Sequence, residues 1–110
     1  MPKNLRVIDL GENQFQGQIA RSFAKCMMLE HFVLGNNQID HSFPFWLGAL
    51  PQLQVLILRS NIFHGAIGSW HSNFRFPKLR IVDLSDNKFI GDFPSEYFQN
   101  WDAMKGATMI

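Results

Sequence analysis

The chain has 110 residues, 46% of them hydrophobic and 17% charged, and a formal net charge of +1. That length allows one domain at most, the composition excludes an intrinsically disordered chain, and the weak charge argues against a nucleic-acid partner. No apolar run approaches the roughly 18 residues that would cross a bilayer. We therefore expect no membrane insertion by this segment, and its first residues do not resemble a secretory signal.

A pattern of eleven residues occurs four times along the chain. It reads leucine, two variable residues, an apolar residue, a variable residue, leucine, two variable residues, asparagine, a variable residue and an apolar residue; it begins at Leu5, Leu29, Leu53 and Leu79. The asparagines are Asn13, Asn37, Asn61 and Asn87, so successive asparagines are 24, 24 and 26 residues apart. A nearly constant period of this length indicates a repeat protein.

The first half of each repeat predicts a short β-strand with one buried face, because apolar and variable residues alternate there. The expected buried pairs are Ile8 and Leu10, Phe32 and Leu34, Leu56 and Leu58, and Val82 and Leu84. Strands of successive repeats should stack as a parallel sheet. The predicted fold is an α/β solenoid, a right-handed superhelix with the parallel sheet on its concave face.

The repeated asparagine stands where the chain turns away from the sheet. We expect its amide to bond backbone groups of its own and the neighbouring turn, so that the four side chains form an asparagine ladder. The spine residues, two positions later, are expected to stack on one another; they are Phe15, Ile39, Phe63 and Phe89. Two positions after these, three repeats have glycine, which tolerates conformations that a Cβ penalises; the second repeat has His41 instead.

The second half of each repeat predicts a short helical or 3₁₀ segment on the convex side, because its apolar residues recur at helical spacing. The predicted domain organisation is four repeats over residues 1–94 (about 5–28, 29–52, 53–78 and 79–94) and a helical segment over 95–110. Residues 69–74 are expected to form a loop. In the last segment, Ser95 is the expected helix cap and Gly106 the end, with an apolar stripe of Tyr97, Phe98, Trp101 and Met104,. The stripe either covers the end of the solenoid or binds a partner.

With its 24-residue period and its glycine after the spine residue, the extended pattern resembles the plant-specific class of extracellular leucine-rich repeats. Four segments are similar to plant receptor-like proteins, the cell-surface immune receptors that lack a kinase domain. These segments are residues 34–39 (LGNNQI), 43–48 (FPFWLG), 56–61 (LILRSN) and 93–101 (FPSEYFQNW). The resemblance covers essentially the whole chain.

The resemblance implies a recognition module on the extracellular side of the plasma membrane, in defence or developmental signalling. It also implies a protein or peptide ligand, receptor-kinase partners and no cofactor. Members have a signal peptide, an N-terminal cap, a non-repeat island and a membrane helix, none of which is expected here, so the resemblance suggests a fragment from late in such an ectodomain. Two alternatives stay open: a secreted leucine-rich-repeat inhibitor of cell-wall-degrading enzymes, and a fragment without function.

Partner-binding residues are expected on the concave face of the solenoid, the outer face of the sheet, where the variable strand positions line up in columns. The candidates are His31, Val33, Val55, Ile57, Arg59, Ile81 and Asp83. They form an apolar patch with a polar rim to which Asp9 also contributes. Such patches often mark protein contacts, but exposed β-branched residues also simply favour strands, and both interpretations are kept.

The sequence predicts no enzyme. Asp9 and Asp83 share a column but stand three strands apart, roughly 14 Å, whereas acid–base carboxylate pairs work at about 5–9.5 Å. The four histidines have no metal-ligand spacing,, and Asp40, His41 and His64 are expected to meet only as a surface polar contact. Cys26, the single cysteine, is expected to be a buried thiol without a neighbouring base. We therefore expect no catalytic residue, metal or cofactor.

Overall fold

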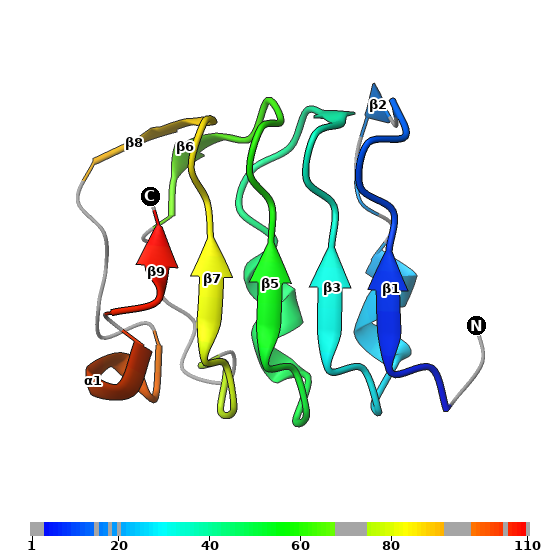
Figure 1. The fold of residues 1–110 in the computed structure, drawn as a ribbon, viewed down its shortest axis with the longest axis vertical. Helices are drawn as coiled ribbons and strands as arrows, with labels where there is room; N and C mark the ends of the chain where they lie inside the picture. The colour runs from blue at the N-terminus through cyan, green and yellow to red at the C-terminus, as the bar shows by residue number, and fades with distance from the viewer. Residues whose placement is uncertain are drawn as a thin grey trace.

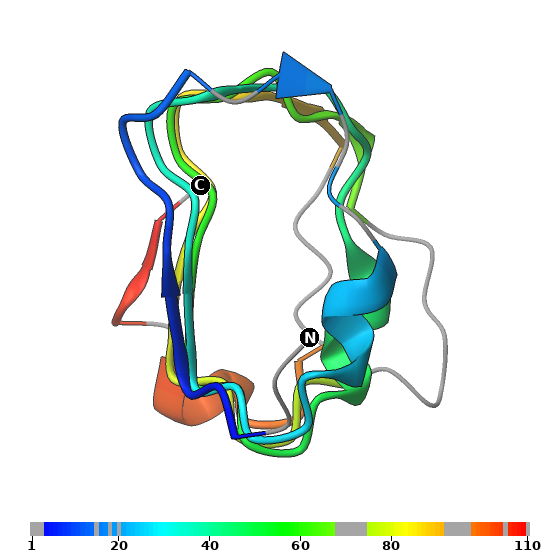
Figure 2. The same cartoon turned by 90° about the vertical axis from the view of Figure 1, so that its right-hand side faces the viewer.

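The chain winds into stacked coils that each contribute one strand to a parallel sheet. The computed structural model describes residues 4–14, 16–17, 19, 21–67, 75–91, 98–104 and 106–109. Five strands lie side by side in the order β1 (Val7–Asp9), β3 (His31–Val33), β5 (Val55–Ile57), β7 (Ile81–Asp83) and β9 (Thr108–Met109) (Figure 1). Seen along the coil axis, the successive turns superimpose (Figure 2). The predicted solenoid with its parallel sheet is confirmed.

The register of the sheet follows the repeat. The partners along the middle of the strands are Ile8, Phe32, Leu56 and Val82, and all four are buried. A shift of one residue would turn this row to the solvent, so the alternation of apolar and variable residues sets the register. The second leucine is also buried in three repeats, whereas Leu10 is only partly buried.

A second side of each coil carries short strands that the sequence did not predict. β2 (Gln16–Gly17) pairs with β4 (Gln38–Ile39), and β6 (His64–Ala66) pairs with β8 (Lys88–Ile90), both in parallel. Between the two pairs, Ser42 forms a parallel bridge with His64, and Ile62 donates its N–H to the Ile39 carbonyl at 2.9 Å. In Figure 1 these segments lie at the top, beyond the carboxyl ends of the sheet strands.

The glycines two positions after the spine residue have a left-handed backbone; this position is called the glycine slot. Gly17, Gly65 and Gly91 have φ angles of 84°, 80° and 79°, a conformation that costs roughly 1–2 kcal/mol in a residue with a Cβ. His41 occupies the same slot and is not among the residues with positive φ. The second coil therefore follows a different path there, and β4 ends at Ile39.

The spine residues lie along this second side, and two of them stack their rings. Ile39 and Phe63 are buried and Phe89 is half-buried, and the rings of Phe63 and Phe89 are parallel within 15° with centroids 6.1 Å apart. Phe15 lies outside the described residues. A further ring cluster, which the sequence did not predict, joins Phe43, Phe76 and Phe98 through centroid distances of 5.1 to 6.3 Å.

Two short helices lie opposite the sheet, as Figure 2 shows. They are the 3₁₀ helices η1 (Arg21–Lys25) and η2 (Phe45–Ala49), which confirms the predicted type of convex-side segment. Apolar residues in and after them, Cys26, Leu29, Trp46, Leu47, Leu50 and Leu53, are buried. The predicted loop at 69–74 lies outside the described residues.

The last segment differs from the predicted helix. Among the described residues of 95–110, Trp101–Met104 form an α-helix (α1), and Thr108–Met109 form β9, which pairs with β7. This strand supplies an acceptor for the edge of β7, because Leu84 donates its N–H to the Met109 carbonyl at 2.7 Å,. Phe98 and Met104 of the predicted stripe are buried, while Ser95 and Tyr97 lie outside the described residues. In the described part of the chain, no helix has the length and apolar character needed to cross a membrane.

Candidate functional site

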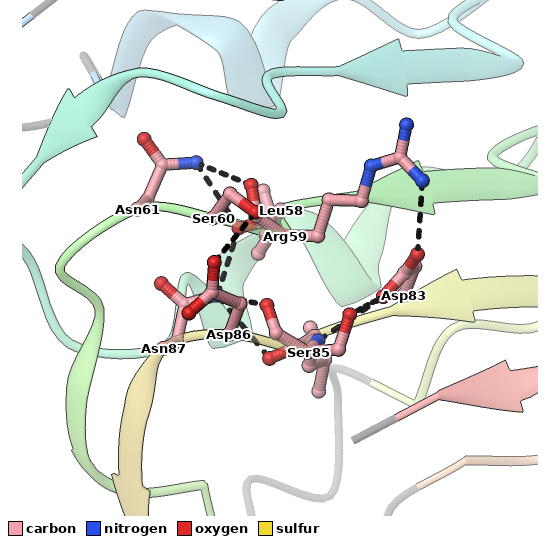
Figure 3. Close-up of polar contacts among 9 residues, drawn as sticks. Leu58, Arg59, Ser60, Asn61, Asp83, Ser85, Asp86 and Asn87 are labelled. Atoms are coloured by element: carbon pink, nitrogen blue, oxygen red, sulfur yellow. Dashed lines mark hydrogen bonds and ion pairs between the residues drawn. The ribbon is translucent and has the colours of Figure 1, made fainter.

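The asparagine ladder connects neighbouring coils just after each sheet strand. Asn61 donates its side-chain N–H groups to the carbonyls of Leu58 and Arg59 in its own turn, at 3.1 Å each, and to Leu34 of the preceding turn at 2.9 Å. Its Oδ1 accepts the N–H of Ile39. Asn37 and Asn87 repeat the pattern, Asn87 again with Leu58 of the coil before it (Figure 3). The exposed Asn13 bonds the Gly11 carbonyl at 2.7 Å.

The residue before each ladder asparagine has a left-handed backbone. Its φ angles are 60°, 60°, 57° and 54° in Glu12, Asn36, Ser60 and Asp86. Few residues other than glycine adopt this region, and asparagine and aspartate do so most readily. The left-handed backbone of this row was not predicted from the sequence, although two of its four members are of those types. The row forms the border of the sheet face next to the ladder, where Ser60 donates a hydrogen bond to Asp86 at 2.9 Å.

The outer face of the sheet, here called the sheet face, brings most of the predicted binding residues together. One column of Cα partners contains Val7, His31, Val55 and Ile81, and the next contains Asp9, Val33, Ile57 and Asp83. The apolar members form a continuous surface: Ile81 is 41% exposed, and Val33, Val55 and Ile57 are half-buried. His31 and Arg59 are exposed beside them.

Asp83 departs from the prediction, because it is not an exposed rim residue but only 6% exposed. Strand β9 runs beside it, and Met109 is its Cα partner. One carboxylate oxygen accepts both the hydroxyl and the N–H of Ser85, at 2.6 and 3.1 Å, and the other lies 3.9 Å from Arg59 Nη1 (Figure 3). Asp83 therefore helps to orient Arg59 and offers little surface to a ligand.

A hollow of about 330 Å³ lies on the sheet face near the ladder. Its lining comes from three strands and the turns after them: Asp9, Gly11, Glu12, Val33, Gly35, Asn36, Ile57 and Arg59. Because the two glycines have no side chain, the surface is depressed there, and the side chain of Arg59 lies against Gly35. A Cβ on Gly35 would stand 3.3 Å from Arg59 Cγ, which is tighter than an ordinary contact. Sequence reasoning did not predict this hollow.

The groups weighed for catalysis are separated or already bonded. Asp9 and Asp83 have β3 and β5 between them. His64 Nε2 and Asp40 Oδ1 are 2.8 Å apart on the surface, which is the predicted polar contact. The ring of His41 instead contacts its neighbour, with Nδ1 2.7 Å from the Ser42 carbonyl. Among the described residues, no group of three histidine, cysteine, aspartate or glutamate side chains is arranged to hold a metal. Cys26 is buried as predicted, and burial raises the pKa of its thiol above the ordinary value of 9.0.

Family models for leucine-rich repeats match residues 3–63 and 78–101. The chain belongs to the leucine-rich-repeat family. This leucine-rich-repeat chain is 46% identical to Receptor-like protein 18 and 50% identical to Receptor-like protein 32, both of Arabidopsis thaliana. Each match extends over 102 residues, 93% of this chain, but covers only 12% and 11% of the two relatives. The predicted resemblance to plant receptor-like proteins is confirmed, and the chain spans about a tenth of their length.

The fold is also found in a solved receptor ectodomain. The Arabidopsis receptor kinase HAESA, crystallised with the peptide hormone IDA and the co-receptor SERK1, superimposes with a TM-score of 0.73 at 30% identity. That match covers 86% of this chain and 15% of the HAESA chain.

Proposed function

We propose that this leucine-rich-repeat chain is a recognition segment of a plant receptor-like protein, which binds a protein or peptide ligand on its sheet face. The observation that carries the proposal is the sheet face itself, where an apolar surface on three adjacent strands meets the hollow beside Arg59. Exposed apolar patches with polar borders are typical of protein contacts. We propose no catalysis for it, because ligand capture needs none of the groups that an enzyme would have to bring together.

The sheet face is preorganised for binding. Its side chains stand on hydrogen-bonded strands, and the ladder ties each turn to the next. Binding of a ligand therefore carries little free-energy cost for ordering the surface that receives it. A hollow of about 330 Å³ lies at the lower end of the range for small-molecule pockets, which suits one or two side chains of a peptide better than a whole small ligand.

The relatives support a proposal for the cellular role. We place the chain on the extracellular side of the plasma membrane, in defence or developmental signalling, with its output passed to a receptor-kinase partner. The solved complex of HAESA with IDA and SERK1 supports this arrangement, because it joins a repeat ectodomain, a peptide and a co-receptor.

A peptide selection tests the proposal. The chain would be used to enrich binders from a phage-displayed library of random peptides, and the binders would be titrated against the double variant Val33→Asp with Arg59→Glu. We expect at least tenfold weaker binding, because a carboxylate enters the apolar surface and the border charge is reversed. The control is Lys25→Glu with Ala49→Asp, two exposed positions on η1 and η2, which should leave binding unchanged.

Circular dichroism melting would verify that both double variants fold. Equal affinity for the wild-type chain and the sheet-face variant would refute the proposal, and so would a failure of the wild-type chain to enrich any peptide.

A further inference from the structure

The hollow on the sheet face is electrically polarised along the direction that crosses the strands. Its β1 end carries Asp9 and Glu12, and its β5 end carries Arg59. In the described part of the chain, neither Asp9 nor Glu12 has an ion-pair partner. Arg59 is 54% exposed and lies at the long distance of 3.9 Å from Asp83. One end of the hollow is therefore negative and the other positive.

The turn that follows β1 positions both acidic residues at this end of the hollow. Asp9 Oδ1 accepts the N–H of Gly11 at 3.2 Å, and the left-handed backbone of Glu12, with φ of 60°, fixes where its side chain leaves the turn. Both residues are exposed. Gly11 lies in the same turn as the two carboxylates and has no side chain, so a ligand backbone can approach them closely. Gly35, in the next turn, makes room for the side chain of Arg59.

The dimensions of the hollow suit an extended peptide. Strands β1 and β5 are two strand spacings apart, roughly 10 Å, and an extended chain advances about 3.3 Å per residue. A peptide that crosses the strands would therefore reach from the negative end to the positive end in about three residues. A bound metal ion is a poorer match, because no third acidic or histidine ligand joins the two carboxylates among the described residues.

We infer that the hollow selects an extended peptide segment with a lysine or arginine side chain between Asp9 and Glu12, and that it disfavours a basic residue about three positions away, where Arg59 stands. The inference rests on the proposed function and specifies the chemistry of its ligand. Charge complementarity of this kind contributes mainly to specificity and to the direction in which the ligand binds. Because both ion pairs would be partly exposed, the preference should weaken as salt rises.

The test is the residue preference of selected peptides rather than binding alone. Peptides enriched by the wild-type chain at low salt should contain lysine or arginine at one position and exclude both about three residues away. The variant Asp9→Asn with Glu12→Gln should lose that preference and bind the same peptides roughly three- to tenfold more weakly. The asparagine keeps an Oδ1 acceptor for the Gly11 N–H, so the turn is preserved. The matched control is Asp86→Asn, an acidic position in the same row outside the hollow.

A charge-inverted variant provides an independent reading. Asp9→Asn with Glu12→Lys should enrich peptides with aspartate or glutamate at the position where the wild-type chain enriches basic residues. Peptides that bind the sheet face, as judged by sensitivity to Val33→Asp with Arg59→Glu, but that show no basic preference would overturn this inference and leave the proposed function intact. Peptides insensitive to that sheet-face variant would refute the proposed function instead.

Discussion

The second and third coils of the solenoid differ from the first in how fully the same motif is buried. Asn61 is 9% exposed and is bonded to two coils, whereas Asn13 is exposed and its side chain bonds Gly11 in its own turn. The leucines behave alike, because Leu58 is fully buried and Leu10 only partly. The same sequence pattern therefore contributes different amounts to the free energy of unfolding. Among the described residues, a coil packs on each side of Asn61 but on only one side of Asn13.

The largest expected effect is in the spine. Phe63→Ala should lower the free energy of unfolding by about 3–5 kcal/mol, because the ring is fully buried and its loss leaves a cavity. Phe89→Ala removes a half-buried ring that stacks on Phe63 and should cost clearly less. Urea denaturation of both variants would measure the difference. An equal loss in the free energy of unfolding for both variants would mean that the contribution of a spine residue does not depend on how deeply its side chain is buried.

The ladder gives the intermediate effect. Asn61→Ala should cost about 2–3 kcal/mol, because carbonyls of two coils and the Ile39 N–H lose a buried partner,. Asn13→Ala should cost at most about 0.5 kcal/mol, because water replaces the amide at an exposed position. Urea denaturation of the two variants would measure both losses in the free energy of unfolding. An equally large cost for Asn13→Ala and Asn61→Ala would contradict the claim that the ladder asparagine contributes less stability in the first coil.

The smallest expected effect is a pH dependence of stability that comes from a buried residue of the first coil. Cys26 follows η1 in that coil and is nonetheless fully buried, and burial raises the pKa of its thiol in the folded state. The folded chain thus holds this proton more tightly than the unfolded chain, so stability is complete below pH 9.0, the unfolded value, and falls as pH rises through the folded value. Unfolding titrations from pH 8 to 10.5 should show a drop that is absent in Cys26→Ala. The same pH dependence in both chains would exclude the thiol as its source.

Some features were predictable because they repeat. The period of leucines and asparagines determined the strands, their register, the buried row and the columns of the sheet face, since only one register turns the repeated apolar position and the second leucine of every strand toward the core. The buried thiol and the contact between Asp40 and His64 also followed from position within the repeat.

Other features were decided only by the tertiary structure, because they depend on what lies beside a residue rather than on its own pattern. β9 covers Asp83, which its column marked as exposed, and the aromatic cluster around Phe76 joins residues of the second coil, the third coil and the last segment. The hollow exists because Gly11 and Gly35 stand next to each other across strands while Arg59 follows them. Repetition along the chain specifies a coil, but burial, charge pairing and surface shape arise between coils, where non-repeated side chains meet.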